Sequence, residues 1–253
     1  MRLNFSWRLR HVKFSIVTIL LVLAVWYAVT AGHSIQPIFL PSPAKTFAAM
    51  FSLLASGRFF VALIASVQRI LIASVLAVFA GGAIGILMGL SEKVEYFFNP
   101  IVQPIRYLPI SALIPLLVLW FGIGENMKIS FLFIAVLSYF IPLVRDAVRN
   151  VPQVYVDVAH SFGVGKWAIV KNIHIPHALP RIFEGLIIVN AIGWNYIILA
   201  EIINARNGLG YLINIAGRLQ RSDEVFAGLM LIALVAIISD YLLRLVRERT
   251  FFW

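Results

Sequence analysis

The sequence contains no cysteine. This absence excludes a disulfide framework, a thiolate metal site and a cysteine nucleophile. The five histidines include no H-E-x-x-H motif, and His174 and His177 flank Pro176, which would interrupt a helical metal-binding face. A G-x-S-x-G nucleophile motif is also missing. We therefore expect a chain that is not an enzyme by itself and that holds no metal.

Charged residues are scarce, at 13% of the 253 residues, whereas hydrophobic residues make up 61%. Soluble domains contain about 45–50% apolar and about 25% charged residues, so the composition predicts an integral membrane protein. The net charge of +10 is of the sign that nucleic acids attract. Basic residues in a membrane protein, however, normally mark one side of the bilayer, and no nucleic-acid partner is expected.

Hydrophobic segments predict an all-α integral membrane protein with six transmembrane helices in one domain, residues 1–253. A spanning helix needs about 20 mainly apolar residues, so the third and fourth segments are short, and prolines bend the third. The first follows a basic stretch, as in a signal peptide, but its apolar run is too long and no A-x-A site follows, which favours a retained helix. The expected spans are 14–31, 61–90, 108–124, 129–144, 182–204 and 225–243.

The distribution of lysine and arginine predicts that the N- and C-termini are both cytoplasmic. In that orientation the inner segments hold fourteen of the 21 basic residues, Arg106 among them, and the outer segments hold six, with Arg69 inside a span. Positively charged loops favour the cytoplasmic side. The loop 145–181 is then cytoplasmic.

This loop carries an amphipathic helical pattern. Pro152 suits the first turn of a helix, and Gly163 suits the left-handed residue just past its end. A second short helix is expected at 169–173, ended by Pro176. The stripe could pack on the membrane domain or on a partner protein, and the spacing leaves both possibilities open. The apolar positions fall on one face: Val154, Val158 and Phe162, with Tyr155 and Ala159 beside them.

The stretch 163-GVGKW-167 contains part of a phosphate-binding loop. The full motif is G-x-x-x-x-G-K-[ST], preceded by a strand. Here His160 stands where the first glycine is needed, and Trp167 replaces the hydroxyl residue that binds magnesium. A helical pattern precedes the glycines, so we expect no nucleotide site in this chain.

The same loop resembles a family motif. Integral-membrane subunits of ATP-binding-cassette (ABC) importers carry the pattern E-A-A-x3-G-x9-I-x-L-P, and this chain reads 157-DVAHSFG-163 followed by Ile173, Ile175 and Pro176 at the same spacing. The departures are Asp157, Val158 and Ile175. Further stretches are similar to permeases of the nitrate/sulfonate/taurine/bicarbonate type, from about residue 38 onward: 40-LPSP-43, 104-PIRYLPISALIPLLVLWFGIGE-125, 176-PHALPRIFEGL-186 and 200-AEIINARNGLGYLI-213.

The resemblance implies a type I importer permease of the MetI-like fold in a bacterial inner membrane, forming a translocation pathway. It implies a second permease copy as a homodimer, a cytoplasmic ABC ATPase dimer that holds ATP and magnesium, and a periplasmic or lipid-anchored substrate-binding protein. The substrate class is a small anion such as sulfonate, taurine, nitrate or bicarbonate. The residues expected to couple the permease to the ATPase are Val154, Tyr155, Asp157, Val158, Ala159, Phe162, Gly163, Ile173 and Pro176.

Polar residues at membrane depth are the candidates for the pathway, because such residues are costly and often functional. For Asn190 and Trp194, which share a helix face, packing between helices is an equal alternative. Glu184 is expected to pair with Arg181. The pathway candidates are Arg106, Ser111, Asn190, Trp194, Asn195 and Glu201, and the candidates for an outer gate or binding-protein contact are Gly208, Leu209 and Gly210.

Three glycines in the second span, Gly81, Gly85 and Gly89, are spaced for close helix packing. The alternative to an ABC permease is an ion-coupled secondary transporter. Such a protein would need coupling carboxylates near the midplane and broken helices in an inverted repeat, and only the third span looks interrupted.

Overall fold

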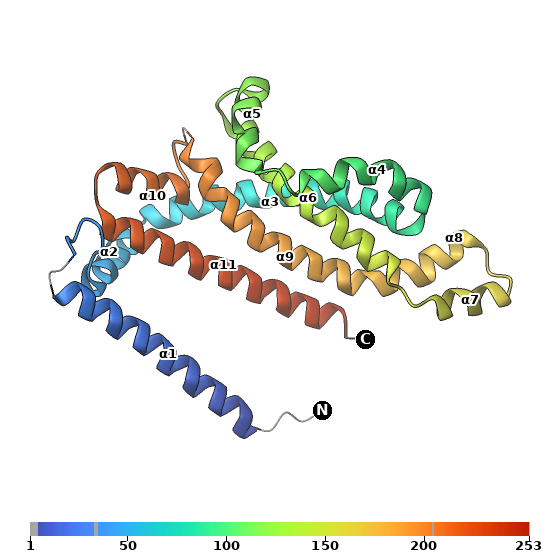
Figure 1. Cartoon of the computed structure of the whole chain (residues 1–253), viewed down its shortest axis with the longest axis horizontal. Helices are drawn as coiled ribbons and strands as arrows, with labels where there is room; N and C mark the ends of the chain where they lie inside the picture. The colour runs from blue at the N-terminus through green and yellow to red at the C-terminus, as the bar shows by residue number, and fades with distance from the viewer. Residues whose placement is uncertain (1–4, 33–34, 204, 253) are drawn as a thin grey trace. The chain divides into compact units, whose positions relative to one another are not determined.

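The computed structural model describes residues 5–32, 35–203 and 205–252, with only the backbone of residues 5–13. Every regular element in these ranges is helical, as the composition predicts (Figure 1). The predicted span end at Asn204 and the terminal Trp253 lie outside the described residues. The helices, in chain order, are α1 (Phe5–Ala31), α2 (Pro43–Ala55), α3 (Arg58–Leu90), α4 (Glu92–Ile105), η1 (Ile110–Leu113), α5 (Ile114–Phe121), α6 (Glu125–Arg149), α7 (Gln153–Ser161), α8 (Lys166–Ile169), the π-helical η2 (Val170–His174), α9 (Ile175–Ile202), α10 (Leu209–Arg218) and α11 (Ser222–Thr250).

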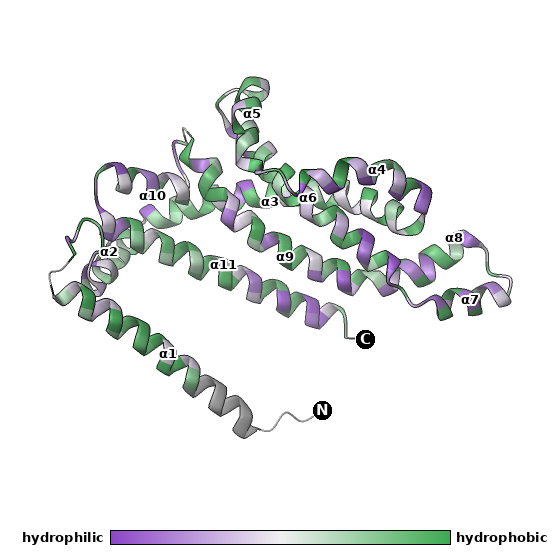
Figure 2. Cartoon of the chain, in the orientation of Figure 1, coloured by the Kyte–Doolittle hydropathy of each residue, from purple (hydrophilic) through white to green (hydrophobic). Residues whose placement is uncertain are grey.

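Five helical segments of the described residues are long and apolar enough to cross a membrane, and a sixth span is possible if one bent pair of helices counts as one. Apolar residues run along most of α3, α9 and α11, whereas hydrophilic residues gather at the C-terminal end of α11 (Figure 2). The five segments are Phe14–Ala31, Arg58–Leu90, Glu125–Arg149, Lys166–Ile202 and Ser222–Thr250.

The third predicted span differs most from the structure. A helix through 108–124 was expected, but the helical segment there runs only from Ile110 to Phe121, and α4 precedes it at an angle of 91°. The break falls before Pro109, and Pro115 starts α5 instead of bending it. A proline is tolerated in the first turn because its missing N–H would have no partner there.

The helices form two compact units by their contacts, Met1–Phe60 with Leu212–Leu231, and Val61–Tyr211 with Ile232–Trp253. In the first unit, Ser42 caps α2 by accepting a hydrogen bond from the backbone N–H of Lys45 at 3.4 Å. This cap fixes the start of the helix that follows 40-LPSP-43. The Trp26 indole donates to the carbonyl of Pro41 at 2.9 Å and thereby ties α1 to this turn.

The core of the second unit lies between α3, α6 and α9, which run side by side (Figure 1). Val136, Phe140 and Val144 of α6 pack between Ala77 of α3 and Val189 of α9. Each of the five is at most 1% exposed. The most buried helix of the unit is therefore α6.

The glycines of α3 pack directly on α6, as predicted. A Cβ atom at Gly85 would lie 2.7 Å from Cβ of Val144, and one at Gly89 would lie 2.7 Å from Cβ of Val148. Both distances are shorter than real Cβ contacts. Each step of four residues on α3 matches a step of four on α6, so the two helices run parallel with their backbones in close approach.

The segment before α9 also differs from the prediction. The second short helix does not end at Pro176, because α8, η2 and α9 form one helical run from Lys166 to Ile202. The π-helical turn of η2 lies where Pro176 would otherwise break the ladder, since proline has no N–H and its ring crowds the carbonyl four residues earlier. The helix passes through the proline by locally widening its turn.

Candidate functional site

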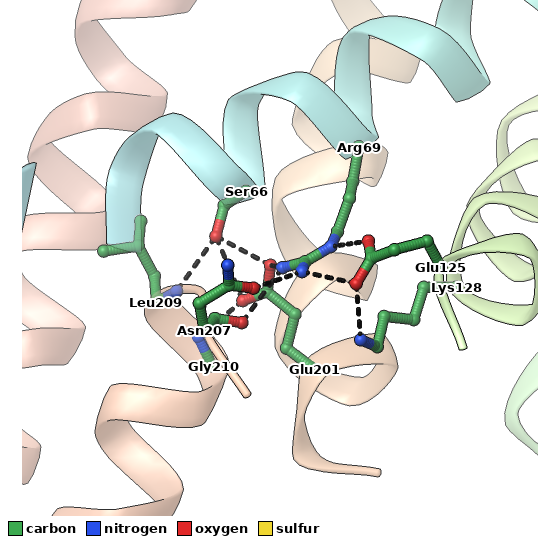
Figure 3. Close-up of polar contacts among 8 residues, drawn as sticks. All are labelled: Ser66, Arg69, Glu125, Lys128, Glu201, Asn207, Leu209 and Gly210. Carbon is green, nitrogen blue, oxygen red and sulfur yellow. Dashed lines mark hydrogen bonds and ion pairs between the residues drawn. The ribbon is translucent and has the colours of Figure 1, made fainter. Parts of the chain in front are cut away.

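A charged network, buried except at Glu125, joins α3, α6 and the end of α9 (Figure 3). Arg69 on α3 is 4% exposed. Its Nε and Nη2 donate to the two carboxylate oxygens of Glu125 at 2.6 and 2.8 Å, and its Nη1 donates to Glu201 at 2.6 Å. Nη1 and Nη2 also donate to the backbone carbonyl and side-chain oxygen of Asn207. The five N–H donors of the guanidinium thus have five acceptors.

Glu201 is completely buried at the end of α9. Its carboxylate accepts hydrogen bonds from the Ser66 hydroxyl and from the backbone N–H of Gly210, both at 2.8 Å. The same hydroxyl accepts the backbone N–H of Leu209 at 2.9 Å. Gly208 has φ +118°, and a side chain there would collide with the Glu201 carboxylate. The network therefore fixes the 208–210 segment, and the predicted outer residues lie together.

The network is electrically balanced. Lys128, 3% exposed, donates to Glu125 at 2.9 Å, so that two cations face two carboxylates. Buried charges need such partners to offset their desolvation. No local sequence pattern connects these residues, although Arg69 inside an apolar span is a signal that an acidic residue must pair with it.

Two of the predicted pathway residues contact α11. The Asn190 amide and the Trp194 indole donate to the hydroxyl of Ser239 at 3.0 and 2.9 Å. That hydroxyl in turn donates to the Ala236 carbonyl at 2.9 Å. These contacts confirm that Asn190 and Trp194 share a face, and they are packing contacts between α9 and α11.

The remaining pathway candidates are exposed. Asn195 bonds only its own helix, donating to the Ala191 carbonyl at 3.0 Å. Arg106 follows the last residue of α4, and Ser111 lies in η1 across the bend. Glu184 pairs with Arg247 of α11. The prediction of a Glu184–Arg181 pair was wrong, because α11 brings a second arginine to this carboxylate while Arg181 donates to the Asn150 carbonyl.

The predicted helix of the inner loop is α7, which begins after Pro152 and ends at Ser161. Phe162 caps it and Gly163 follows with φ +72°. The N–H of Gly163 bonds the His160 carbonyl at 2.9 Å, and the N–H of Val164 bonds the Ala159 carbonyl at 3.0 Å. This pair of bonds is a Schellman motif. The left-handed glycine expected from the sequence is confirmed.

The two faces of α7 differ in burial. Val156 and Ala159 are buried against Ile169, with Ile173 beside them. Most of the predicted coupling residues lie on the opposite face, where Phe162 is 83% exposed. Of the residues predicted for coupling, Ala159 is buried and Ile173 and Pro176 are half-buried, and the exposed ones are Val154, Tyr155, Asp157, Val158, Phe162 and Gly163.

No three His, Asp or Glu side chains lie close enough together to hold a metal ion in the ranges that the structure describes. The features that stand out are therefore a charge-balanced network at one end of the second unit, a helix with an open apolar face at the other, and a bent pair of helices between them.

Residues 81–251 match the family model described as "Binding-protein-dependent transport system inner membrane component". The chain belongs to this family. This permease is the membrane subunit of an ABC importer, an inner membrane component that works with a substrate-binding protein and an ATPase. The family leaves the ion-coupled secondary transporter without support.

Curated relatives cover nearly the whole permease. The taurine transport system permease protein TauC of Escherichia coli is 36% identical over 261 residues, spanning 100% of this chain and 94% of TauC. The putative aliphatic sulfonates transport permease protein SsuC of Bacillus subtilis is 29% identical, spanning 92% of this chain and 84% of SsuC.

Solved structures show the same fold. The MetNI methionine ABC transporter in an inward-facing conformation matches with a TM-score of 0.66 at 17% identity, covering 78% of this chain and 95% of the other. An amino acid ABC transporter crystallised with histidines matches with a TM-score of 0.61 at 18% identity, covering 78% and 96%. The permease thus has the MetI-like fold that the resemblance implied.

Proposed function

We propose that this permease imports small anions of the sulfonate class, taurine among them, as a homodimer whose two α7 helices dock on a cytoplasmic ATPase dimer. The ATPase holds ATP and magnesium, and a binding protein delivers the substrate at the other side. The observation that carries the docking is the open apolar face of α7.

The length of the helical run that follows α7 supports a position of α7 outside the bilayer. Lys166 to Ile202 is a run of 37 residues, about 55 Å at 1.5 Å per residue. A bilayer is about 40–45 Å thick including its headgroups. Because the outer network holds the Ile202 end, the Lys166 end projects from the opposite surface. α7 packs on this projecting part.

The apolar residues exposed on α7 and on the Lys166 end of the helical run need a partner that covers them. Val154, Val158 and Phe162 are each more than half exposed, and Trp167 is 76% exposed. Clustered exposed apolar side chains of this kind mark protein interaction sites, and aromatic residues dominate the binding energy of such sites. A groove on the ATPase is the partner that the importer family supplies.

α7 is also joined firmly to the rest of the unit. Three residues, 150–152, separate it from α6. The Tyr155 ring lies 4.8 Å from the His177 ring of α9 between centroids. A movement imposed on α7 would therefore reach the inner ends of α6 and α9, as a rigid-body transition requires.

The docking is tested with Phe162→Ala in the permease co-expressed with its ATPase and binding protein. We expect at least about tenfold weaker retention of the ATPase on the purified permease, because truncating a hot-spot aromatic costs about 2 kcal/mol or more. Phe39→Ala is the matched control, since Phe39 is 73% exposed but lies in the predicted outer loop. The docking is contradicted if both variants lose the ATPase equally, or if neither variant loses it.

The substrate class is supported by the relatives, which are named for taurine and aliphatic sulfonates. Uptake of labelled taurine into proteoliposomes that contain the complete importer tests it, with unlabelled alkanesulfonate, nitrate and bicarbonate as competitors. Transport of a cation or a neutral solute, with none of these anions carried or competing, contradicts the proposal.

A further inference from the structure

We propose that Arg106 binds the acidic headgroup of the transported anion at the middle depth of the permease. This inference rests on the proposed function, because it needs an anionic substrate. It assigns the recognition of the substrate's charge inside the membrane to one side chain at the break between α4 and α5.

The position of Arg106 follows from the contacts of α4. Near its start, Glu95 pairs with Arg145 at 3.2 Å close to the end of α6. Further along, Val102 packs in one cluster with Ile141. α4 therefore runs antiparallel to α6, away from the Arg149 end.

These contacts set the depth. α6 has 25 residues, which is about 37 Å. Ile141 lies eight residues before Arg149, or about 12 Å from the end of the helix, and Arg106 lies four residues beyond Val102, about 6 Å further. Arg106 is thus about halfway along α6. The sequence places Arg106 both among the inner charges and among the pathway candidates, and this depth agrees with the second, because α4 carries the chain back along α6 before Arg106.

Arg106 differs from the other cations at membrane depth. Arg69 and Lys128 are buried and bonded to Glu125 and Glu201. Arg106 is exposed, and within the described ranges its guanidinium has no carboxylate partner. A lone charge at this depth is costly against lipid. About 18 Å from the end of α6, it lies near the middle of that helix and not at its end.

The local backbone presents the side chain at a bend. The chain turns by 91° between α4 and η1–α5, and Ile110, 1% exposed, anchors the far side of the turn. Such a break in a membrane helix is tolerated where it lines a cavity or is covered by protein. The bend and the unpaired charge are both unfavourable against lipid, and an aqueous pathway accommodates both.

Sulfonate is a suitable ligand for this guanidinium. Its oxygens carry a delocalised negative charge, and the planar fork of arginine donates two parallel hydrogen bonds to such groups. Lysine would supply the charge without the fork. The proposal therefore predicts that the charge and the geometry both contribute.

The test uses the complete importer in proteoliposomes, with taurine as the probe. We expect Arg106→Gln to lower taurine uptake at least about tenfold, as for the loss of hydrogen bonds to a charged group, and Arg106→Lys to restore part of it. Retention of the ATPase on the purified permease is measured in parallel, because a defect in assembly would lower it and a defect in substrate binding would not. Lys93→Gln, on the exposed start of α4, is the matched control and should keep uptake within about twofold.

Three results would overturn the inference. Full uptake by Arg106→Gln shows that the headgroup is bound elsewhere. Loss of ATPase retention together with uptake shows that Arg106 supports assembly, for example by pairing with an acid of the second copy. A wild-type importer that carries taurine separates both results from a failure of the proposed function, whereas a wild type that carries none of taurine, alkanesulfonate, nitrate and bicarbonate overturns the function and this inference together.

Discussion

Glu201 is the most constrained charged residue of the network that joins α3, α6 and α9. Its carboxylate is fully buried and is held by Ser66, Arg69 and the backbone of Gly210. A carboxylate without such partners would not remain charged in this environment. Burial of this one side chain therefore explains why the 208–210 segment, which follows a loop, has a fixed place.

Replacing Glu201 with Gln should destabilise the permease by about 3 kcal/mol, because breaking a buried ion pair leaves its partner's charge uncompensated. The free energy of unfolding in detergent micelles measures this. Glu184→Gln is the control on the same helix, since Glu184 is half-exposed and its pair with Arg247 lies at the surface. We expect less than about 1 kcal/mol for it. Equal losses in the two variants would contradict a special role for the network.

At the scale of elements, the close contact between α3 and α6 holds the core of the second unit together. Two glycines of α3 that lie three residues apart differ sharply in their surroundings: a Cβ at Gly85 would meet α6 at 2.7 Å, whereas a Cβ at Gly82 would meet nothing within 4 Å. Adding one methyl group by Gly→Ala therefore tests close packing at position 85 and helix propensity alone at position 82.

Gly85→Ala should lower the midpoint of thermal unfolding, by an amount that corresponds to about 1–3 kcal/mol, because overpacking forces the two backbones apart. Gly82→Ala should leave it unchanged or raise it, since alanine favours a helix over glycine by about 1 kcal/mol. Thermal unfolding of the two purified variants measures the difference. The packing assignment fails if Gly85→Ala is as stable as Gly82→Ala.

The sequence predicted some elements better than others for physical reasons. Hydropathy located α3, α6, α9 and α11 because each is a long apolar run. It missed α4, because Glu92 and Glu95 lower its hydropathy and Pro100 and Pro104 read as helix breakers, although both prolines lie inside the helix. Local patterns report what a residue prefers, and they do not report that a neighbouring helix will pair with its charges.

At the scale of the whole molecule, the proposed link between α7 and transport depends on how α7 ends. Gly163 has φ +72°, and no atom lies within 4 Å of a Cβ built on it or on Gly165. Gly165 has φ −66°. The two glycines therefore differ in backbone conformation and not in available space.

Gly163→Val should reduce taurine uptake and the stimulation of ATP hydrolysis by the loaded binding protein, because a β-branched residue disfavours the left-handed region by about 1–2 kcal/mol and would misdirect Phe162. Gly165→Val should affect both much less. Uptake and ATP hydrolysis in proteoliposomes are the measurements. Normal transport and normal stimulation in Gly163→Val would refute the coupling assignment.

The functional groups were predictable to different degrees. The motif around Gly163 is local, so its helix and its cap could be predicted from spacing. The network at the other end joins Arg69 to Glu201, 132 residues apart, and no local pattern connects them. The exposure of Phe162 and the depth of Arg106 also depend on which helices lie beside them, and the prediction of one membrane domain stays a prediction.

The helical run from Lys166 to Ile202 connects these distant groups. Its inner end carries the surface on which α7 rests, and its outer end carries Glu201. If this run pivots about its middle by about 10°, the two ends, each about 27 Å from the pivot, swing by about 5 Å in opposite directions. Such a movement would narrow the proposed pathway at one end of the run while widening it at the other. The π-helical turn η2 lies between the middle of this run and its Lys166 end, and the run would bend there first.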